Sequence, residues 1–204
     1  SDVSGHGVPA AFITTMIKSY ITRYEKLQTD PAGLLNYLNH NLIGQCAGNF
    51  ITAFYCIYHL KENFIEYANA GHNDPFLVTG EEISYLLSSK KSFPLATADN
   101  FQLNKMKKEF ANNTAVINKG EKIVFYTDGL VEIVKKDDPK IELKESDIHE
   151  LLIKNFDASP QKCIENIYQN IVNFREDENF DDDICIICMD TDHSTINWSD
   201  LLGY

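Results

Sequence analysis

The sequence has no long apolar run. Its 204 residues are 44% hydrophobic and 24% charged, but no stretch approaches the roughly 20 apolar residues that a membrane-spanning helix needs. No apolar signal segment stands at its start. We therefore expect a cytoplasmic protein with no membrane segment in this chain. The length suits one domain with a substantial core.

Cations are scarce as well. The 18 lysines and arginines are outnumbered by 30 acidic residues, which gives a net charge of −12. Binding nucleic acid without regard to its sequence requires clustered cations, so the composition argues against that class. Residues 175–192 hold eight acids and a single cation, Arg175. This run is either a solvated surface or a segment that holds metal cations, and composition leaves both open.

The cysteines follow no disulfide pattern, because there are five of them at irregular spacing. Cys185 and Cys188 have the spacing of redox and zinc motifs, but they lie in the apolar run 184–189. Side chains three apart on a strand point to opposite faces. We therefore expect buried core thiols in a reducing compartment.

Apolar residues recur at helical spacing in four segments. Residues 8–27 carry a broad apolar stripe. Asp30 as the N-cap and Pro31 at the first helical position predict a helix over residues 31–46. Ser146 and Ser159 begin two further amphipathic helices.

Most of the remaining sequence alternates as strands do. Residues 52–60 and 64–70, separated by a short polar turn, predict a hairpin. Further strands are expected at residues 75–79, 83–87, 105–110, 115–118, 123–127 and 184–189, with a polar loop over 88–104. Helices flanking hairpin-connected strands indicate an α+β fold with mostly antiparallel sheets.

Three aspartates stand where strands end or begin. Asp128 follows the strand 123–127, and Asp182 precedes the strand 184–189. If these strands are antiparallel neighbours, the two carboxylates meet at one sheet edge, and Asp2, just before a helix, can join them. Carboxylates from distant parts of a chain are typical of hard-cation sites. They are also common in turns, so both interpretations remain.

Four motifs in a fixed order give the chain a recognisable family pattern. They are DVSGHGVPAA at residues 2–11, ANAGHN at 68–73, KGE followed by FYTDGLVE at 119–121 and 125–132, and DDI at 182–184. This pattern resembles the SpoIIE/RsbU-type branch of the PPM (type 2C) metal-dependent serine/threonine protein phosphatases. The motifs span about nine-tenths of the chain.

The resemblance implies a fold and a metal centre. The fold would be a sandwich of two antiparallel β-sheets flanked by helices, with two Mn²⁺ or Mg²⁺ ions at one sheet edge. Asp2 would bridge the ions, and the carbonyl of Val3 would bind one of them. Asp128 and Asp182 would complete the protein ligands of the other ion. These three aspartates would be the catalytic residues, through a metal-bound water that attacks the phosphoryl group.

Three further residues would surround those ligands without binding metal. Asp183 would orient the site, and Gly129 adjoins Asp128. His6 is a candidate general acid, but eukaryotic-type relatives place their acidic histidine differently relative to the aspartate, and we favour a structural role for His6 in its Gly-rich turn. Asn69 and His72 are interpreted in the same way, as residues whose hydrogen bonds hold a turn.

The resemblance also implies a substrate and partners. The substrate would be phosphoserine or phosphothreonine on a signalling protein, by analogy a STAS-type anti-anti-sigma factor. An upstream sensor or receiver domain would belong to the full-length protein, and the oligomeric state is left open. Two alternatives remain, namely a catalytically silent module of the same fold that binds or regulates a partner, and a structural cation-binding domain.

The sequence departs from the family pattern in three places. Relatives have a strand and an acidic Gly-Gly-Asp-type segment before the point at which this chain starts. Residues 1–190 would therefore be a phosphatase domain that lacks N-terminal strands, and residues 191–204 a polar tail or linker. Ser1 replaces the usual Gly before the first aspartate, and Ala96 in Pro-Leu-Ala stands where relatives usually carry Gly.

Because one acidic segment of the family pattern has no counterpart, we expect residues 1–204 alone to bind Mn²⁺ weakly and to hydrolyse a phosphopeptide slowly, if at all. Titration with Mn²⁺ and a phosphate-release assay check this. Full activity from residues 1–204 alone would contradict it.

Overall fold

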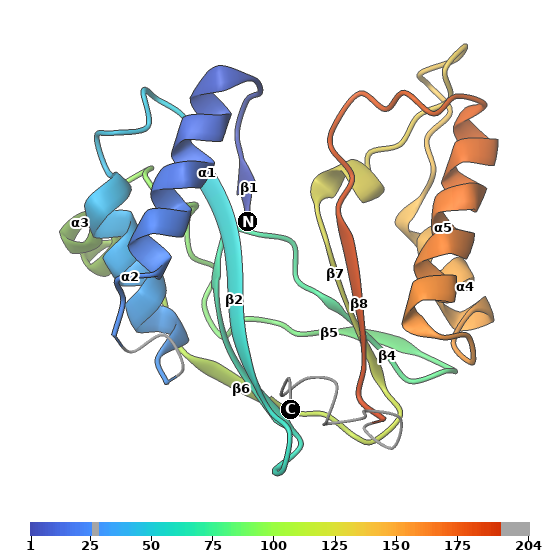
Figure 1. Cartoon of the computed structure of the whole chain (residues 1–204), viewed down its shortest axis with the longest axis horizontal. Helices are drawn as coiled ribbons and strands as arrows, with labels where there is room; N and C mark the ends of the chain where they lie inside the picture. Colours follow the sequence, from blue (N-terminus) through green and yellow to red (C-terminus); the bar gives the residue numbers. More distant parts are fainter. Residues whose placement is uncertain (26–28, 193–204) are drawn as a thin grey trace, which may run out of the picture. The chain divides into compact units, whose positions relative to one another are not determined.

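The structure, a computed structural model, describes residues 1–25 and 29–192. They form two compact units, which are described separately. Unit 1 comprises residues 1–74 and 86–116, and unit 2 comprises residues 75–85 together with 117 onward. Each unit contains a four-stranded antiparallel sheet with helices beside it (Figure 1). The predicted α+β class with two helix-flanked antiparallel sheets is therefore confirmed.

The sheet of unit 1 has the strand order β1-β2-β3-β6. Its strands are β1 (Asp2–Val3), β2 (Ile51–His59), β3 (Phe64–Ala70) and β6 (Asn113–Val116). β2 and β3 form a hairpin in which His59 opposes Phe64. Asn63 closes its turn with a φ of +53°, a conformation that Asn tolerates better than most residues. The predicted hairpin is confirmed to within one residue.

The helices of unit 1 are α1 (Val8–Ile21), α2 (Pro31–Leu42) and α3 (Asn100–Lys105). α2 begins as predicted, because the Asp30 carboxylate accepts the N–H of Gly33 at 2.9 Å and Pro31 takes the first helical position. α2 packs against α1 and against strands β2 and β3. The large apolar side chains on its buried face are Leu34, Leu35, Leu38 and Leu42.

The sheet of unit 2 has the order β5-β4-β7-β8. Its strands are β4 (Phe76–Val78), β5 (Ile83–Tyr85), β7 (Lys122–Tyr126) and β8 (Ile186–Asp190). Neighbouring strands are antiparallel. Phe76 stacks on Tyr126 across β4 and β7 with ring centroids 4.3 Å apart, so the centre of this sheet is held by aromatic contact.

Helices α4 (Glu145–Lys154) and α5 (Pro160–Arg175) belong to unit 2, together with the short 3₁₀ helix η1 (Asp128–Leu130). The Ser159 hydroxyl caps α5 by accepting the N–H of Lys162 at 3.3 Å. Buried residues of α5 and the partly buried Ile186 and Cys188 of β8 lie in one apolar core, and the two elements are in contact. No helix in the described part of the chain is long and apolar enough to cross a membrane.

Two predictions around residue 100 are wrong. The expected loop over residues 88–104 contains α3, which Asp99 and Gln102 start with a capping box. The expected strand over residues 105–110 is the end of α3 and an irregular segment. The helix is only six residues long and buries one side chain, Leu103, so it leaves no apolar stripe in the sequence.

Other helix boundaries shift. The helix expected over residues 8–27 ends at Ile21, because the N–H groups of Arg23 and Tyr24 bond to carbonyls three residues back. Residues 26–28 lie outside the described residues, as does the tail from residue 193 onward. α2 ends at Leu42 rather than 46, since Ile43 has an extended ψ of 130°.

Residue 96 adopts a backbone conformation that favours glycine. Ala96 has a φ of +65°, where a Cβ atom crowds the backbone. Its N–H donates to Oδ1 of the buried Asn39 at 2.8 Å, and the amide of Asn39 donates to the carbonyl of Ala98 at 2.9 Å. These bonds hold the loop on α2 and keep Ala96 in its strained conformation. This position is the one at which the sequence departs from the Pro-Leu-Gly of the family.

We therefore predict that Ala96→Gly stabilises the protein. Relief of a left-handed alanine is worth about 1–2 kcal/mol, and the greater chain entropy of glycine offsets about 0.5–1 kcal/mol of it. A net gain of roughly 0.5–1 kcal/mol should appear in urea unfolding. Ala98→Gly, two residues away without a positive φ, is the control and should destabilise. A variant no more stable than the parent would contradict the prediction.

Candidate metal centre

Asp128 and Asp182 lie at the same end of two paired strands. β7 and β8 are antiparallel neighbours, and their last paired residues at this end are Tyr126 and Ile186. Asp128 follows β7 by two residues in η1, and Asp182 precedes β8 in the incoming loop. The sequence left the antiparallel adjacency of these strands as a condition, and the structure meets it.

A threonine hydroxyl ties the two segments together beyond the last strand pair. The backbone N–H of Thr127 donates to the carbonyl of Cys185 at 3.1 Å. Its Oγ1 donates to the carbonyl of Asp183 at 3.0 Å and accepts the N–H of Cys185 at 2.9 Å. Thr127 is buried, so each of these polar groups is satisfied inside the protein.

Gly129 allows the two segments to approach closely. A Cβ atom built on Gly129 would lie 2.6 Å from the carbonyl oxygen of Asp183, which no real side chain tolerates. Only glycine therefore fits here without moving the backbone of Asp183. Gly129 and Asp183, expected near the metal ligands, contact each other through the backbone.

The carboxylates of Asp128 and Asp182 each accept a hydrogen bond at only one of their two oxygens. Oδ1 of Asp128 accepts the N–H of Gly129 at 3.1 Å, and Oδ1 of Asp182 accepts the N–H of Asp183 at 2.8 Å. Among the described residues, Oδ2 of neither side chain accepts a hydrogen bond, and neither carboxylate pairs with a cation. Two unpaired carboxylates at one strand end suit a hard divalent cation, which prefers such oxygens.

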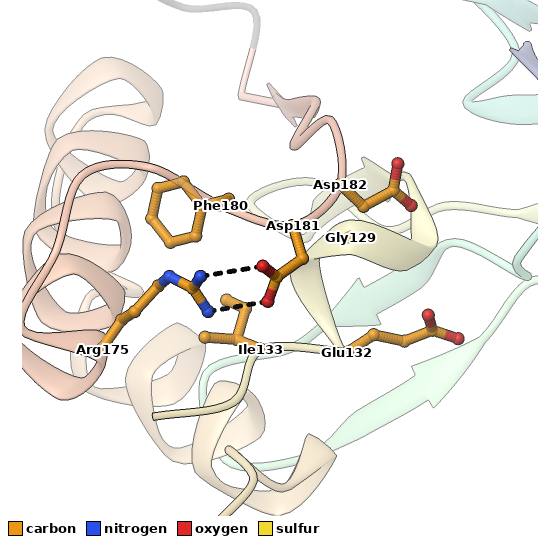
Figure 2. A pocket seen from close by; sticks show the side chains of 7 residues that line it. All are labelled: Gly129, Glu132, Ile133, Arg175, Phe180, Asp181 and Asp182. Carbon is orange, nitrogen blue, oxygen red and sulfur yellow. Dashed lines mark hydrogen bonds and ion pairs between the residues drawn. The ribbon is translucent and has the colours of Figure 1, made fainter. Parts of the chain in front are cut away.

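A cavity of about 210 Å³ lies beside this strand end in unit 2. It is lined by Gly129, Glu132, Ile133, Arg175, Phe180, Asp181 and Asp182. Figure 2 shows Arg175 and Asp181 facing each other in it, and the Asp182 carboxylate directed away from that pair.

The sequence analysis gave Arg175 no functional role, although its spacing from the apolar residues of α5 indicates that it is buried. Arg175 continues the buried row Cys163, Ile167 and Ile171 at intervals of four residues on α5. It therefore lies on the core face of the helix, where an arginine requires partners. Glu132, which lines the same cavity, was likewise given no separate role.

Asp2 and Val3 are in unit 1, where they form the edge strand β1. Asp2 opposes Thr52 and Val3 opposes Ile51 of β2. Beyond the strand, Ser4 binds Phe50 twice, with its N–H donating to the carbonyl at 2.9 Å and its Oγ accepting the N–H at 2.8 Å. The opening motif is thus part of the sheet, and its backbone is fixed.

His6 lies in the turn between that strand and α1. Gly5 and Gly7 flank it with φ values of +91° and +79°, so the turn depends on two residues that tolerate the left-handed region. The His6 side chain is exposed and makes no hydrogen bond to another described residue. Its role near the metal ligands remains a prediction.

A hydrogen-bonded turn follows β3 on the same sheet. The Asn69 side chain accepts the N–H of His72 at 2.8 Å and donates to its carbonyl at 2.9 Å, which confirms that Asn69 holds the turn. Nδ1 of His72 bonds to Oγ1 of Thr52, the residue opposite Asp2, at 2.8 Å. Asn69 also donates to Asp74 at 3.0 Å, and burial raises the pKa of the Asp74 carboxyl.

Each unit therefore holds part of the predicted ligand set. Unit 2 brings Asp128 and Asp182 together, while Asp2 and Val3 belong to unit 1. Within the residues that the structure describes, no three His, Cys, Asp or Glu side chains are grouped as metal ligands. Ligation by the four residues stays a prediction.

The fold is that of the PP2C-type phosphatase domains. Its solved relatives include the SiaA-PP2C domain of Pseudomonas aeruginosa, with a TM-score of 0.76 and 16% identity over 92% of this chain and 71% of that one. A structure of RsbU and RsbW domains from Mycobacterium tuberculosis gives a TM-score of 0.68 and 21% identity, over 93% of this chain and 49% of that one.

The family assignment rests on the sequence as well. The model of the family Stage II sporulation protein E (SpoIIE) matches residues 1–192, and the chain belongs to this family. It is 26% identical over 188 residues to phosphoserine phosphatase RsbU of Bacillus subtilis. That match covers 92% of this chain and 53% of RsbU, so the chain spans about half the length of this curated relative.

Two further solved relatives have been studied with metals. RsbX in complex with magnesium has a TM-score of 0.58 and 20% identity, over 91% of this chain and 75% of that one. The phosphatase domain of SpoIIE from Bacillus subtilis, presoaked with Mn, has a TM-score of 0.55 and 12% identity, over 96% and 80%.

The hydrogen bonds of the Thr127 hydroxyl to Asp183 and Cys185 lead to a stability prediction. Thr127→Val keeps the shape of the side chain but leaves the carbonyl of Asp183 and the N–H of Cys185 without their partner. We expect the free energy of unfolding to fall by about 1–3 kcal/mol, measured by urea denaturation. Thr127→Ser retains the hydroxyl and should lose less than half as much. Equal losses would show that the hydroxyl is not the stabilising group.

Proposed function

We propose that this chain is the phosphatase domain of a metal-dependent protein phosphatase that hydrolyses phosphoserine and phosphothreonine. The observation that carries the proposal is the pairing of β7 with β8, which sets Asp128 and Asp182 at one strand end, where neither carboxylate pairs with a cation among the described residues. Membership of the SpoIIE family supports the reaction class, and RsbU, a relative, is a phosphoserine phosphatase.

In this proposal two Mn²⁺ or Mg²⁺ ions would be held by oxygen ligands of this chain. Asp2, the Val3 carbonyl, Asp128 and Asp182 would supply these ligands. Carboxylate and carbonyl oxygens are the ligands that such cations prefer, and the magnesium and manganese studies of relatives support this choice.

The chain's own residues orient this ligand set. β1 fixes the backbone of Asp2 and Val3 through its pairing with β2. The Thr127 hydroxyl and the close approach of Gly129 fix the carbonyl of Asp183, and His6 lies in the turn that leads into α1. When bound, the cations would lower the pKa of a water molecule and offset the charge of the phosphoryl group.

The proposal also includes a substrate and a regulatory domain. We assign the substrate to a phosphorylated STAS-type signalling protein, and regulation to an upstream sensor or receiver domain. The solved relative with RsbU and RsbW domains in one structure supports a regulatory setting of this kind. Residues 1–190 would form the phosphatase domain and residues 191–204 a tail, in a cytoplasmic protein. Its five cysteines are free thiols; Cys46 and Cys163 are buried as expected, whereas Cys185 is exposed and the expectation of a buried core thiol is wrong there.

Asp128→Asn tests the proposal in the full-length protein. Loss of a metal ligand should lower Mn²⁺-dependent phosphate release from a phosphoprotein by more than about a hundredfold, since even residues that only support ligands contribute 10–100-fold. Asp137→Asn makes the same change of charge at an exposed position of unit 2 and should leave the rate unchanged. Equal, metal-independent rates in all three proteins would refute the phosphatase. A parent protein that binds a phosphoprotein without turning it over would identify the silent module instead.

A further inference from the structure

Arg175 is a buried guanidinium that binds two other segments of unit 2. Only 7% of the residue is exposed. Nε donates to the carbonyl of Asn179 at 2.7 Å, and Nη1 donates to the carbonyl of Val134 at 3.0 Å. Nη1 and Nη2 each reach one carboxylate oxygen of Asp181 at 3.0 Å (Figure 2). A two-pronged pair of this geometry fixes orientation as well as distance.

These bonds hold the chain directly before Asp182. Asp181 is the residue that precedes the proposed ligand, and Arg175 orients it from the end of α5. On the other side, the carbonyl of Asp183 is held by the Thr127 hydroxyl at 3.0 Å. The proposed ligand therefore lies between two anchored neighbours, one bound to a helix and the other to a strand end.

The ion pair is poorly placed to serve stability alone. The side chain of Asp181 is 73% exposed, whereas that of Arg175 is 8% exposed. A carboxylate that faces water gains little from an ion pair. Arg175 also keeps its two bonds to backbone carbonyls and lies 5.8 Å from the centre of the Phe180 ring, so part of its burial is compensated without Asp181. What Asp181 adds is the orientation of the loop.

We propose that Arg175, acting through Asp181, is a positioning residue that sets the Asp182 carboxylate for the metal centre. This inference rests on the proposed function, in which Asp182 is a ligand. Arg175 is placed by the apolar row of α5, so the packing of that helix is transmitted through the guanidinium to the strand end that carries Asp182.

Asp181→Ala is the variant that tests the proposal, because it removes the two hydrogen bonds between Arg175 and the carboxylate and leaves both bonds of Arg175 to backbone carbonyls. In the full-length, metal-free protein we expect faster amide hydrogen exchange at Asp183 and Cys185, by about tenfold, as the segment opens locally. The N–H groups of these residues bond to Asp182 Oδ1 and Thr127 Oγ1. Unchanged exchange at both amides would overturn the proposal.

Metal affinity is the second readout, and it distinguishes positioning from plain stability. Asp181→Ala should weaken Mn²⁺ binding by about 10–100-fold, the range for residues that orient ligands, measured at a temperature at which parent and variant are both fully folded. Asp181→Asn retains one acceptor oxygen, so its Mn²⁺ affinity should lie between those of the parent and Asp181→Ala. Affinity equal to the parent in Asp181→Ala would overturn the proposal even if exchange were faster.

Glu176→Ala is the matched control. Glu176 is an exposed acid near the same loop, and its carboxylate pairs with Lys135 at 3.0 Å. It should change neither readout by more than about twofold, as is typical of exposed ion pairs. A control that weakens Mn²⁺ binding as much as Asp181→Ala would attribute the effect to net charge and overturn the proposal.

Failure of the proposed function gives a different result. A parent protein that binds no Mn²⁺ and releases no phosphate would refute the metal-dependent phosphatase and with it the ligand role of Asp182. The exchange rates in metal-free protein would still decide whether Arg175 and Asp181 fix the backbone at that position.

Discussion

The antiparallel pairing of β7 with β8 is the constraint on which the candidate site depends. It aligns Tyr126 with Ile186, and the double use of the Thr127 hydroxyl extends the alignment to the turns beyond the strands. A slip of one residue would move every side chain of a strand to the opposite face. The apolar faces of β7 and β8 therefore set, through their register, where Asp128 and Asp182 lie.

The rest of unit 2 supports this pairing. α5 packs its row of buried residues on the sheet, and the last member of that row is an arginine rather than an apolar residue. A buried guanidinium is unfavourable without partners, and the acidic run after α5 supplies one in Asp181. Part of the acidity in residues 175–192 is thus engaged in binding a cation of the protein itself, while Asp182 forms no ion pair with any residue that the structure describes.

Unit 1 illustrates how loops are fixed by side-chain amides. Asn39, fully buried on α2, holds the loop that contains Ala96, and Asn69 encloses the turn after β3. The strained φ of Ala96 persists because these bonds over-determine the loop. α3 was missed for a related reason, since its start depends on the capping box of Asp99 and Gln102 rather than on an apolar stripe.

The sequence by itself determined the fold class, the family motifs and most strands. Periodicity and capping residues are local properties, as the hairpin of β2 and β3 and the Asp30 cap of α2 confirm. Only tertiary structure decided that β7 pairs with β8, that Thr127 joins the two turns, and that Arg175 binds Asp181. These contacts join residues far apart in the chain or depend on which helix face is buried. No local pattern specifies such partners, because their distance is set by the packing of whole elements.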